Sequence, residues 1–541
     1  MKKIKTPRLV LKSLANNGVT EIFHLPGSSI APIYGAIEGK SRIKPILLKH
    51  EQAACFAATG YALTTNKPGI CMVMGGPGIT NLVSAVAECY YQSVPLVFIT
   101  VDHPRENLGS EGFHEIDSFT MLSPITKKII TPKKASDVEK SVADAISIAS
   151  SGRPGPVYLN IPNTIIDESA PFKNIRIKNK TAKPSAAQIA KSVEMIKRAE
   201  NPMLFLGSGV IRSSAEEELK KFIKLTGIPA LSSLGGRNSL PPDFPLSIGM
   251  PPYTFNTDII NRADLFIALG ARLNPVNLRM GMLKLPEKII RVDIDNENPR
   301  FRKANLYIKA DIKEFLNAIN KKVASMSKDF PIASGKKIYE EYQKAYNSYK
   351  NEEYKKLKKD KSTLTSKRFL LELSDFIKDK KASFFTDSIW IPYSHLMPEM
   401  KHKRAFFSTR SFGCLGFALP AAIGASFSQK DRKIISLSGD GGFMFNCQDL
   451  STAADYRLKN FVQIILNNNG YSSLNYLANM KYRKQDDYYM WKKIDFSALS
   501  KSMGVKPIEI KSPSGIKKAL KKVFSENGPH LINVITKEKG V

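Results

Sequence analysis

Short apolar runs alternate with stretches of helical periodicity along most of the chain. At the N-terminal end, strands are expected at residues 19–23, 43–48, 70–74 and 95–101, and helices at 7–16 and 79–91. Apolar runs this short, separated by helices, are typical of parallel strands buried on both faces. The pattern therefore predicts an α/β fold with a doubly wound parallel sheet.

The same alternation returns twice, after two breaks in the pattern. Charged residues interrupt it around 171–186, and a stretch rich in lysine, glutamate and tyrosine follows at 326–366. We expect three doubly wound α/β domains at residues 1–170, 186–325 and 367–541. Residues 326–366 are predicted to form a charged, solvated helix that links the last two domains.

The most informative stretch runs from Gly439 to Tyr471. An apolar run at 434–437 predicts a buried strand, residues 449–456 a helix, and residues 461–466 a second strand. In such a βαβ unit, the carboxyl ends of both strands lie at one edge of the sheet. Asp440 and Asn468 are therefore expected to lie together.

Asp440 and Asn468 are suitable ligands for a hard cation. One carboxylate, one side-chain amide and nearby carbonyls suit Mg²⁺, and Gly439, Gly441 and Gly442 let the backbone approach a diphosphate. Taken singly, Gly-Asp-Gly is common in turns and Asn-Gly is a hairpin signal. Together, across a strand-helix-strand crossover, they predict a metal-bridged diphosphate site.

The composition changes this picture little. With 541 residues, 43% of them hydrophobic, the chain can bury large cores. A formal charge of +32 suggests nucleic acid as a partner, but the lysines are spread along the chain without a nucleic-acid motif. A basic nucleic-acid-binding protein on an enzyme scaffold is therefore kept only as the non-enzyme alternative.

The cysteines and the chain start bear on the compartment. The five cysteines show neither metal-ligand spacing nor a disulfide framework, which favours core thiols in a reducing cytosol. No export signal is visible at the start of the chain. The uncharged stretch 411–429 contains Pro420 and many small residues, so we expect a buried helix and no membrane span. The chain is predicted to be cytoplasmic.

The Asp440 and Asn468 pair resembles the signature of thiamine-diphosphate-dependent enzymes. In that family Gly-Asp-Gly and a downstream Asn-Asn hold Mg²⁺ and the diphosphate of the cofactor. The resemblance implies that Asp440 and Asn468 are side-chain metal ligands and that Gly470 offers its carbonyl. It also places Tyr471 and the glycines Gly439, Gly441 and Gly442 at the cofactor.

A second resemblance lies near the N-terminus. His50-Glu51-Gln52 and the later Gly76-Pro77-Gly78-x-Thr80-Asn81 are similar to the pyrimidine-binding domain of the acetolactate synthase, benzoylformate decarboxylase and pyruvate decarboxylase family. There the matching glutamate hydrogen-bonds N1′ of the aminopyrimidine, so Glu51 is the predicted catalytic residue. Without the resemblance, the helix dipole alone explains an acid in a first helical turn. Asn81, Pro26 and Gly27 are also expected at the cofactor.

A third run, residues 413–424, closely resembles benzoylformate decarboxylase. Leu415 matches the bulky residue that props thiamine into its V shape, and Gly413 is expected beside it. The alternative is that Leu415 is an ordinary core leucine. With Glu51 and Asp440 at opposite ends of one cofactor, the resemblance implies a homodimer or tetramer whose active sites are shared between subunits.

Family resemblance does not fix the substrate. Ser28 matches a substrate-contacting serine of benzoylformate decarboxylase, but the two histidines of that site fall at Met74 and Asn277. The substrate-site tryptophan of acetolactate synthases aligns with Leu477. His114 stands where the family usually has glutamine, so it either relays protons or is a polar substitution without new chemistry.

The central domain raises the question of a flavin. Arg153 matches a flavin-contacting arginine of acetolactate synthases, or else it is a structural turn residue. The family's central domain binds FAD in some members, a nucleotide in others and nothing in many. The Met-His-Gly of the flavin loop becomes Met250-Pro251-Pro252 here, which argues against FAD.

The resemblance implies a thiamine-diphosphate- and Mg²⁺-dependent enzyme that decarboxylates a small 2-oxo acid, pyruvate first. It would transfer the acyl group to a second carbonyl, as acetolactate synthase does in branched-chain amino acid biosynthesis, and a regulatory subunit is compatible with this. One alternative is a 2-oxo acid decarboxylase that does not ligate. Another is a paralogue that binds the cofactor without turnover.

Overall fold

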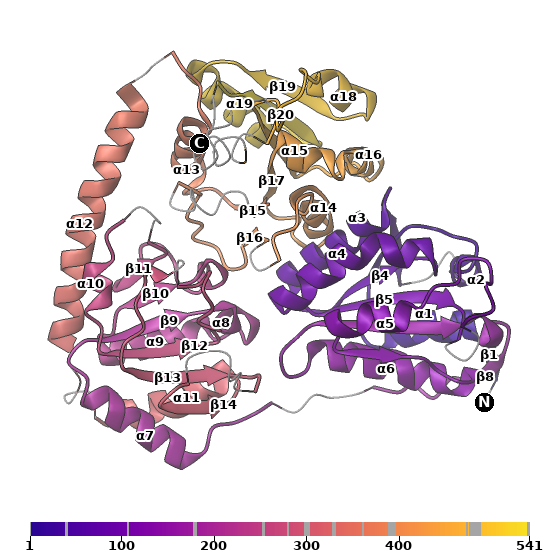
Figure 1. The fold of residues 1–541 in the computed structure, drawn as a ribbon, viewed down its shortest axis with the longest axis horizontal. Coiled ribbons are helices and arrows are strands. Elements are labelled where there is room, and N and C mark those ends of the chain that lie inside the picture. The colour runs from indigo at the N-terminus through magenta and orange to yellow at the C-terminus, as the bar shows by residue number, and fades with distance from the viewer. Residues whose placement is uncertain are drawn as a thin grey trace.

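A computed structural model shows three α/β domains, each built on a six-stranded sheet (Figure 1). This confirms the predicted fold class, since every strand pair within the three sheets is parallel. The structure describes residues 2–37, 42–104, 108–176, 181–251, 255–278, 281–296, 303–326, 330, 332–359, 362–387, 396–409, 412–471, 474 and 488–537.

The N-terminal domain has the strand order β3-β2-β4-β5-β7-β6. Its central strands are buried along their whole length, as expected for a parallel sheet covered on both faces. The strands are β2 (Glu21–His24), β3 (Lys44–Leu47), β4 (Gly69–Met72), β5 (Leu96–Asp102), β6 (Lys128–Ile130) and β7 (Pro156–Pro162). The helices are α1 (Thr6–Asn16), α2 (Ala31–Gly35), α3 (Glu51–Thr65), α4 (Pro77–Gln92), α5 (Ser118–Leu122) and α6 (Ala135–Ser150). A short antiparallel pair, β1 (Lys3–Lys5) with β8 (Ser169–Pro171), was not predicted.

The C-terminal domain repeats this arrangement with the order β16-β15-β17-β18-β20-β19. The predicted βαβ unit is present, with β17 and β18 adjacent. The strands are β15 (Ala382–Thr386), β16 (Phe406–Ser408), β17 (Lys433–Gly439), β18 (Phe461–Asn467), β19 (Lys506–Ile510) and β20 (His530–Ile535). The helices are α13 (Ser366–Ile377), α14 (Ala418–Ser428), α15 (Asp440–Met444), α16 (Leu450–Asp455), α18 (Phe496–Ser502) and α19 (Pro513–Ser525).

The central domain has the order β11-β10-β9-β12-β13-β14. Its strands are β9 (Pro202–Leu206), β10 (Ala230–Ser232), β11 (Ser247–Gly249), β12 (Leu265–Leu269), β13 (Lys288–Asp293) and β14 (Leu306–Lys309). Its helices are α7 (Ala186–Lys197), α8 (Ser208–Arg212), α9 (Glu216–Thr226), α10 (Asp258–Asn261) and α11 (Ile312–Ala324). Apolar clusters lie on both faces of this sheet, so it too is doubly wound.

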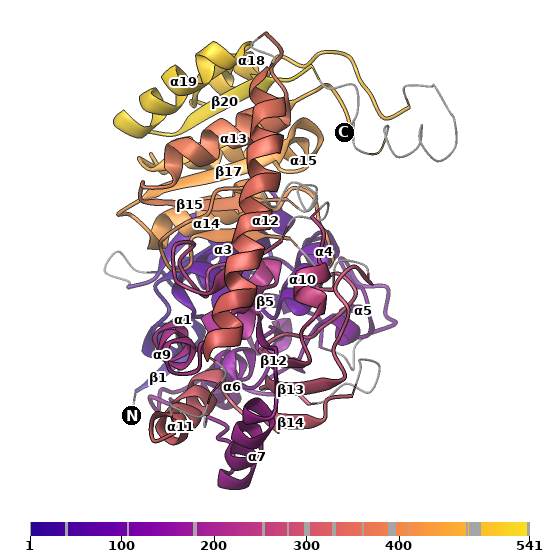
Figure 2. The ribbon, with the colours of Figure 1, turned by 90° about the vertical axis from the view of Figure 1, so that its left-hand side faces the viewer.

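The helix predicted within 326–366 is α12 (Ile332–Lys359), which runs from the central domain to α13 (Figure 2). The expectation that it is solvated is wrong for one face. Tyr342 is fully buried and packs against Phe255 of the central domain, with ring centroids 5.4 Å apart. Near the other end, Tyr354 packs on the C-terminal core. The lysine-rich sequence of α12 also contains tyrosines at helical spacing. Through these tyrosines, α12 packs on both the central and the C-terminal domain.

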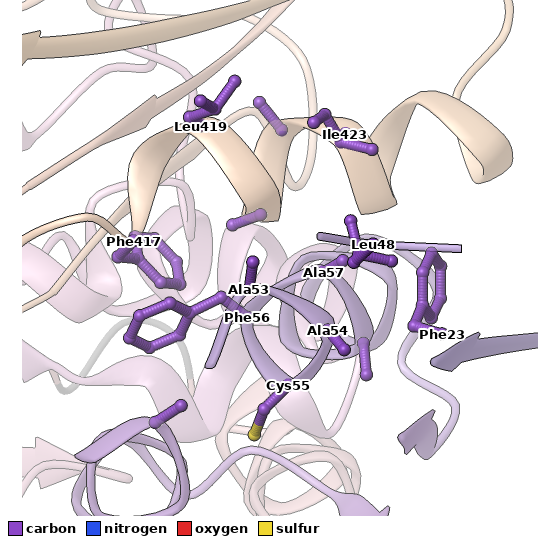
Figure 3. Close-up of a cluster of buried hydrophobic side chains, with 14 of the residues drawn as sticks. Phe23, Leu48, Ala53, Ala54, Cys55, Phe56, Ala57, Phe417, Leu419 and Ile423 are labelled. Atoms are coloured by element: carbon purple, nitrogen blue, oxygen red, sulfur yellow. The ribbon is translucent and has the colours of Figure 1, made fainter. Parts of the chain in front are cut away.

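The apolar stretch at 411–429 forms α14, which packs against α3 of the N-terminal domain (Figure 3). Phe417 and Phe56 meet edge to face, with centroids 5.4 Å apart. Glycine is required at the crossing, because a Cβ on Gly60 would overlap the carbonyl of Ala421. One apolar cluster therefore joins the first and last domains. No helix in the described part of the chain combines the length and apolar character needed to cross a membrane.

Candidate cofactor site

Asp440 is a buried carboxylate at the carboxyl end of β17. It is 1% exposed, and the N–H of Gly470 donates to its Oδ2 at 2.9 Å. Burial raises the pKa of Asp440 to about 6, although the N–H groups of Gly470 and Gly441 partly offset this. Among the described residues no lysine or arginine pairs with it. A divalent cation at this place would therefore offset the unfavourable burial of its charge.

Asn468 directly follows β18, whose Leu466 pairs with Gly439 of β17. The two predicted metal ligands thus lie at one sheet edge, as the βαβ argument expected. Gly470 is held there by its bond to Asp440 and by a bridge to Met490. The donor set is one carboxylate, one amide and one carbonyl, which fits Mg²⁺. Their role as metal ligands stays a prediction.

The glycines around Asp440 serve different purposes. A Cβ on Gly441 would overlap the Tyr471 ring, and one on Gly442 would lie 2.5 Å from the Asp387 carboxylate. Packing alone explains these two glycines. Gly439 meets nothing within 4 Å, so it offers the open space that a diphosphate needs.

Glu51 opens α3 at the carboxyl edge of the N-terminal sheet. It is 8% exposed, and Asn81 of α4 donates through Nδ2 to Glu51 Oε2 at 3.0 Å. Gly78 lies close, since a Cβ there would be 3.7 Å from Glu51 Oε1. The structure thus brings Glu51 and Asn81 together, with the carboxylate fixed and largely shielded from water.

The loop after β2 and the loop that carries Gly78 both lie against Met74. A Cβ on Gly27 would be 2.6 Å from Met74 Cβ, and one on Gly78 would be 3.0 Å from Met74 Cγ. Pro26 and Ser28 on this loop are exposed. The loop therefore lies near Glu51, and Met74, which stands where benzoylformate decarboxylase has a histidine, lies between this loop and Gly78.

His114 lies over the loop that carries Gly76. A Cβ on Gly76 would be 2.7 Å from His114 Cβ, and His114 has a left-handed φ of 67°. Its ring stacks on Phe113, with centroids 3.7 Å apart. His114 is therefore next to the Gly76–Gly78 loop that borders Glu51, and its part in proton transfer stays a prediction.

The Glu51 segment and the Leu415 loop meet within one chain. Asn446 donates through Nδ2 to Gln52 Oε1 at 3.1 Å and to the carbonyl of Gly416 at 2.8 Å. Leu415 is half-buried and lies near Gly442, so it is not an ordinary core leucine. The segment that carries Glu51 and the C-terminal domain that carries Asp440 are thus in contact within one chain.

Sequence reasoning missed several residues that hold these loops in place. Asp387 follows β15 and accepts from the N–H groups of Phe417 and Ala418, both at 3.0 Å. Its complete burial raises its pKa to about 7. An acid directly after an apolar strand was the available signal. Glu88 and Asp449, also fully buried, contact loops of the opposite domain.

Arg153 lies in a cleft between the N-terminal and central domains. It donates to the Tyr90 carbonyl at 2.7 Å and to Ser93 Oγ at 2.9 Å, and it pairs with Asp295 at 3.7 Å. These contacts support the structural alternative for Arg153. The cleft holds about 200 Å³, below the roughly 300–1,000 Å³ of ordinary ligand pockets. FAD binding stays a prediction, and we derive no flavin step. Pro252 and Leu477 lie outside the described residues.

Comparison with known proteins agrees with the geometry. Residues 4–121, 189–319 and 392–534 match the models for the N-terminal TPP binding, central and C-terminal TPP binding domains of thiamine pyrophosphate enzymes. The chain is 31% identical to a probable acetolactate synthase large subunit of Methanocaldococcus jannaschii, over 98% of this chain and 92% of that protein. It is 30% identical to acetolactate synthase isozyme 1 large subunit of Escherichia coli, over 98% and 94%. With chloroplastic acetolactate synthase of Arabidopsis thaliana it shares 29% identity, over 97% and 80%.

Proposed function

The chain belongs to the thiamine pyrophosphate enzymes, within the acetolactate synthase family, and from this premise we propose its reaction and substrates. With Mg²⁺ and thiamine diphosphate, it removes CO₂ from pyruvate and joins the remaining acyl group to the carbonyl carbon of a second 2-oxo acid. With pyruvate in both roles, two pyruvate anions and one proton give one acetolactate anion and CO₂. No oxidant or reductant is needed.

The observation that carries this proposal is that the chain holds both halves of a cofactor site, a shielded carboxylate and a cation site. Glu51, fixed by Asn81, lies in a segment that contacts the C-terminal domain through Gln52 and Asn446. Asp440 lies in that same domain, at an edge suited to a metal-bound diphosphate. A carboxylate at one end and a cation site at the other are what thiamine diphosphate requires.

When bound, thiamine diphosphate supplies the electron sink for breaking the bond between a carbonyl carbon and a carboxylate. Asp440, Asn468 and the Gly470 carbonyl would hold Mg²⁺, and Gly439 leaves room for the phosphates. Glu51 accepts and returns a proton through its carboxylate at the pyrimidine end. Asn81 orients that carboxylate, and burial keeps bulk water away from it.

One observation favours a second candidate, a decarboxylase that does not ligate. His114 lies over Gly76, beside the loop that borders Glu51, where an imidazole can donate a proton to the product. Protonation there would release an aldehyde in place of a ligated acid. In this second candidate, His114 is the proton donor.

Incubation of the purified protein with pyruvate, thiamine diphosphate and Mg²⁺ separates these candidates. Acetolactate as the product supports carboligation. Free acetaldehyde supports the decarboxylase and removes the ligation proposal. If neither forms while the cofactor is bound, pyruvate is the wrong substrate or the chain is an idle paralogue, and a panel of 2-oxo acids distinguishes these.

The assembly is also a proposal. Two of the relatives are named large subunits, which implies a smaller companion subunit for those proteins. We expect this chain to form a homodimer or tetramer in which one subunit supplies Glu51 and another supplies Asp440 to each site. A regulatory subunit is compatible with this arrangement.

A further inference from the structure

The first and last domains repeat one arrangement of elements around the helix pair α3 and α14. β3 before α3 occupies the same sheet position as β16 before α14, and β4 before α4 matches β17 before α15. At the crossing, a Cβ on Gly60 would overlap the Ala421 carbonyl, and one on Gly424 would overlap the Ala57 carbonyl. These pairs are reciprocal and stand at one constant offset along the chain. An approximate twofold axis therefore relates the two domains.

A buried carboxylate lies in the segment that follows the matching strand, β4 or β17, in each domain. Glu88 of α4 is fully buried, and its Oε2 accepts the N–H groups of Gly413 at 2.9 Å and Cys414 at 3.1 Å. Asp449, between α15 and α16, is fully buried, and its Oδ1 accepts the N–H of Lys49 at 2.8 Å. Each carboxylate thus crosses the domain boundary and holds the backbone of the loop before the other domain's central helix.

The loops held in this way carry the residues at the cofactor. Lys49 stands two positions before Glu51, and Gly413 stands two positions before Leu415. Glu51 and Leu415 are separated by the same number of residues as Lys49 and Gly413. Loop N–H groups outside a strand or helix need another acceptor once they are buried, and without one they favour a displaced loop.

We propose that Asp449 and Glu88 are positioning residues, Asp449 for Glu51 and Glu88 for Leu415, so that each domain holds the cofactor loop of the other. This rests on the proposed function only for the role of Glu51 and Leu415. The hydrogen bonds themselves are independent of the reaction. What matters is an acceptor oxygen at each place, and a negative charge is not required.

The chain offers a matched control at the same loop. Asp455 of α16 also contacts Lys49, but through the side chain, with Lys49 Nζ 3.0 Å from Asp455 Oδ2. The Asp455 side chain is 57% exposed. Asp455→Asn therefore removes an ion pair across the same boundary and leaves the Lys49 N–H bond in place.

The first test uses cofactor-free protein and backbone amide exchange measured by mass spectrometry. Leucine and asparagine at position 449 both branch at Cγ, but only asparagine keeps an acceptor oxygen. We expect exchange at the Lys49 amide to be about tenfold faster in Asp449→Leu and within about twofold of wild type in Asp449→Asn and Asp455→Asn. Similar melting temperatures would show that the domain is still folded.

The second test uses protein loaded with thiamine diphosphate and Mg²⁺. Asp449→Leu should slow proton exchange at C2 of the cofactor about tenfold without changing the half-saturating cofactor concentration. Glu88→Met should instead raise that concentration about tenfold, because the Leu415 loop shifts. Glu88→Gln should stay near wild type, since Gln92, which donates to Glu88 Oε1 at 2.7 Å, can turn its amide to accept.

Two results would overturn the proposal. In one, Asp449→Leu exchanges its Lys49 amide as slowly as wild type. In the other, the leucine and asparagine variants are impaired equally, which would point to charge or fold and not to an acceptor. A wild-type protein that neither exchanges the C2 proton nor consumes a 2-oxo acid would end the proposed function, while the amide comparison would still decide the positioning role.

Discussion

Three buried carboxylates near the proposed cofactor site differ in the donors that surround them. Glu51 receives a side-chain amide from Asn81, Asp440 receives backbone N–H groups, and Asp449 receives the N–H of Lys49. Asp449 also accepts the hydroxyl of Thr452 at 3.0 Å. Asn81 orients the Glu51 carboxylate, whereas backbone donors join Asp440 to Gly470 and Asp449 to Lys49.

At the residue scale, Glu51→Gln tests the proton-transfer role. Glutamine can still accept from Asn81, so the surroundings of residue 51 should keep their shape while the site loses a group that takes up a proton. We expect proton exchange at C2 of bound thiamine diphosphate, followed by NMR in deuterated buffer, to fall by about 10²–10⁴-fold. An unchanged rate in a folded, cofactor-loaded variant would remove Glu51 from the mechanism.

Asp440→Asn tests the metal site. Replacing the buried carboxylate by an amide removes the charged ligand, so the Mg²⁺ concentration needed to retain thiamine diphosphate should rise by about 10–100-fold. Isothermal titration with Mg²⁺ measures this, and chelation should release the cofactor from wild type. Asp431→Asn, at an exposed position just before β17, is the control and should bind like wild type. Equal affinities in all three proteins would contradict the site.

Asp449 gives a prediction for pH. Burial raises its pKa to about 7, well above that of an unfolded aspartate near 4. The folded protein therefore binds more protons between these values, so the contribution of Asp449 to stability is lost as pH rises through about 7. Asp449→Asn has no such loss. Its free energy of unfolding minus that of wild type, measured by denaturant unfolding, should increase from pH 5 to pH 8 by on the order of a few kcal/mol at most. A difference independent of pH would show that this carboxyl does not titrate as stated.

At the element scale, the crossing of α3 and α14 determines how the first and last domains meet. Both helices are rich in alanine and present glycine where the backbones touch, which permits an approach that larger side chains would prevent. α3 begins at Glu51, and α14 begins three residues after Leu415. The packing of α3 on α14 therefore also sets where Glu51 and Leu415 lie.

Gly60→Ala tests this crossing. The added methyl would overlap the Ala421 carbonyl, which belongs to the backbone and cannot turn aside, so we expect destabilisation of about 1–3 kcal/mol. Gly35→Ala in α2 is the control, because nothing lies within 4 Å of the added atom there, and it should be neutral or slightly stabilising. Thermal unfolding of both variants measures the effect. Equal melting temperatures would mean that the two helices are farther apart in solution.

At the scale of the whole molecule, α12 ties the central domain to the last one, while the α3 and α14 pair ties the last to the first. The central domain thus carries no proposed catalytic residue, yet it constrains both others. The high positive charge is distributed over the chain and draws anions such as a diphosphate and a 2-oxo acid toward the protein without selecting among them.

Mixing two inactive variants tests whether sites are shared between subunits. In a heterodimer of Glu51→Gln with Asp440→Asn, one of the two sites contains both wild-type residues if each site draws on two subunits. Random pairing would then restore about a quarter of wild-type activity after subunit exchange. Sites built within one chain would give no recovery in the mixture, and product formation after exchange distinguishes the two cases.

The sequence by itself determined the alternation of strands and helices, the three sheets and the shared edge of Asp440 and Asn468. These follow from local periodicity and from the direction of a βαβ crossover, which a short stretch of chain specifies. The same reasoning located Glu51 and Asn81 through their resemblance to a family, and the structure then placed them in contact.

Only the tertiary structure decided which residues hold the cofactor loops and which positions are buried against a distant element. The bond from Glu88 to Gly413, the burial of Tyr342 in a lysine-rich helix and the contacts of Arg153 all join segments far apart in the chain. No local sequence pattern predicts such contacts, because they depend on how the folded domains pack against one another. A side chain's hydrogen-bond partner is set by that docking, and its residue type alone does not reveal it.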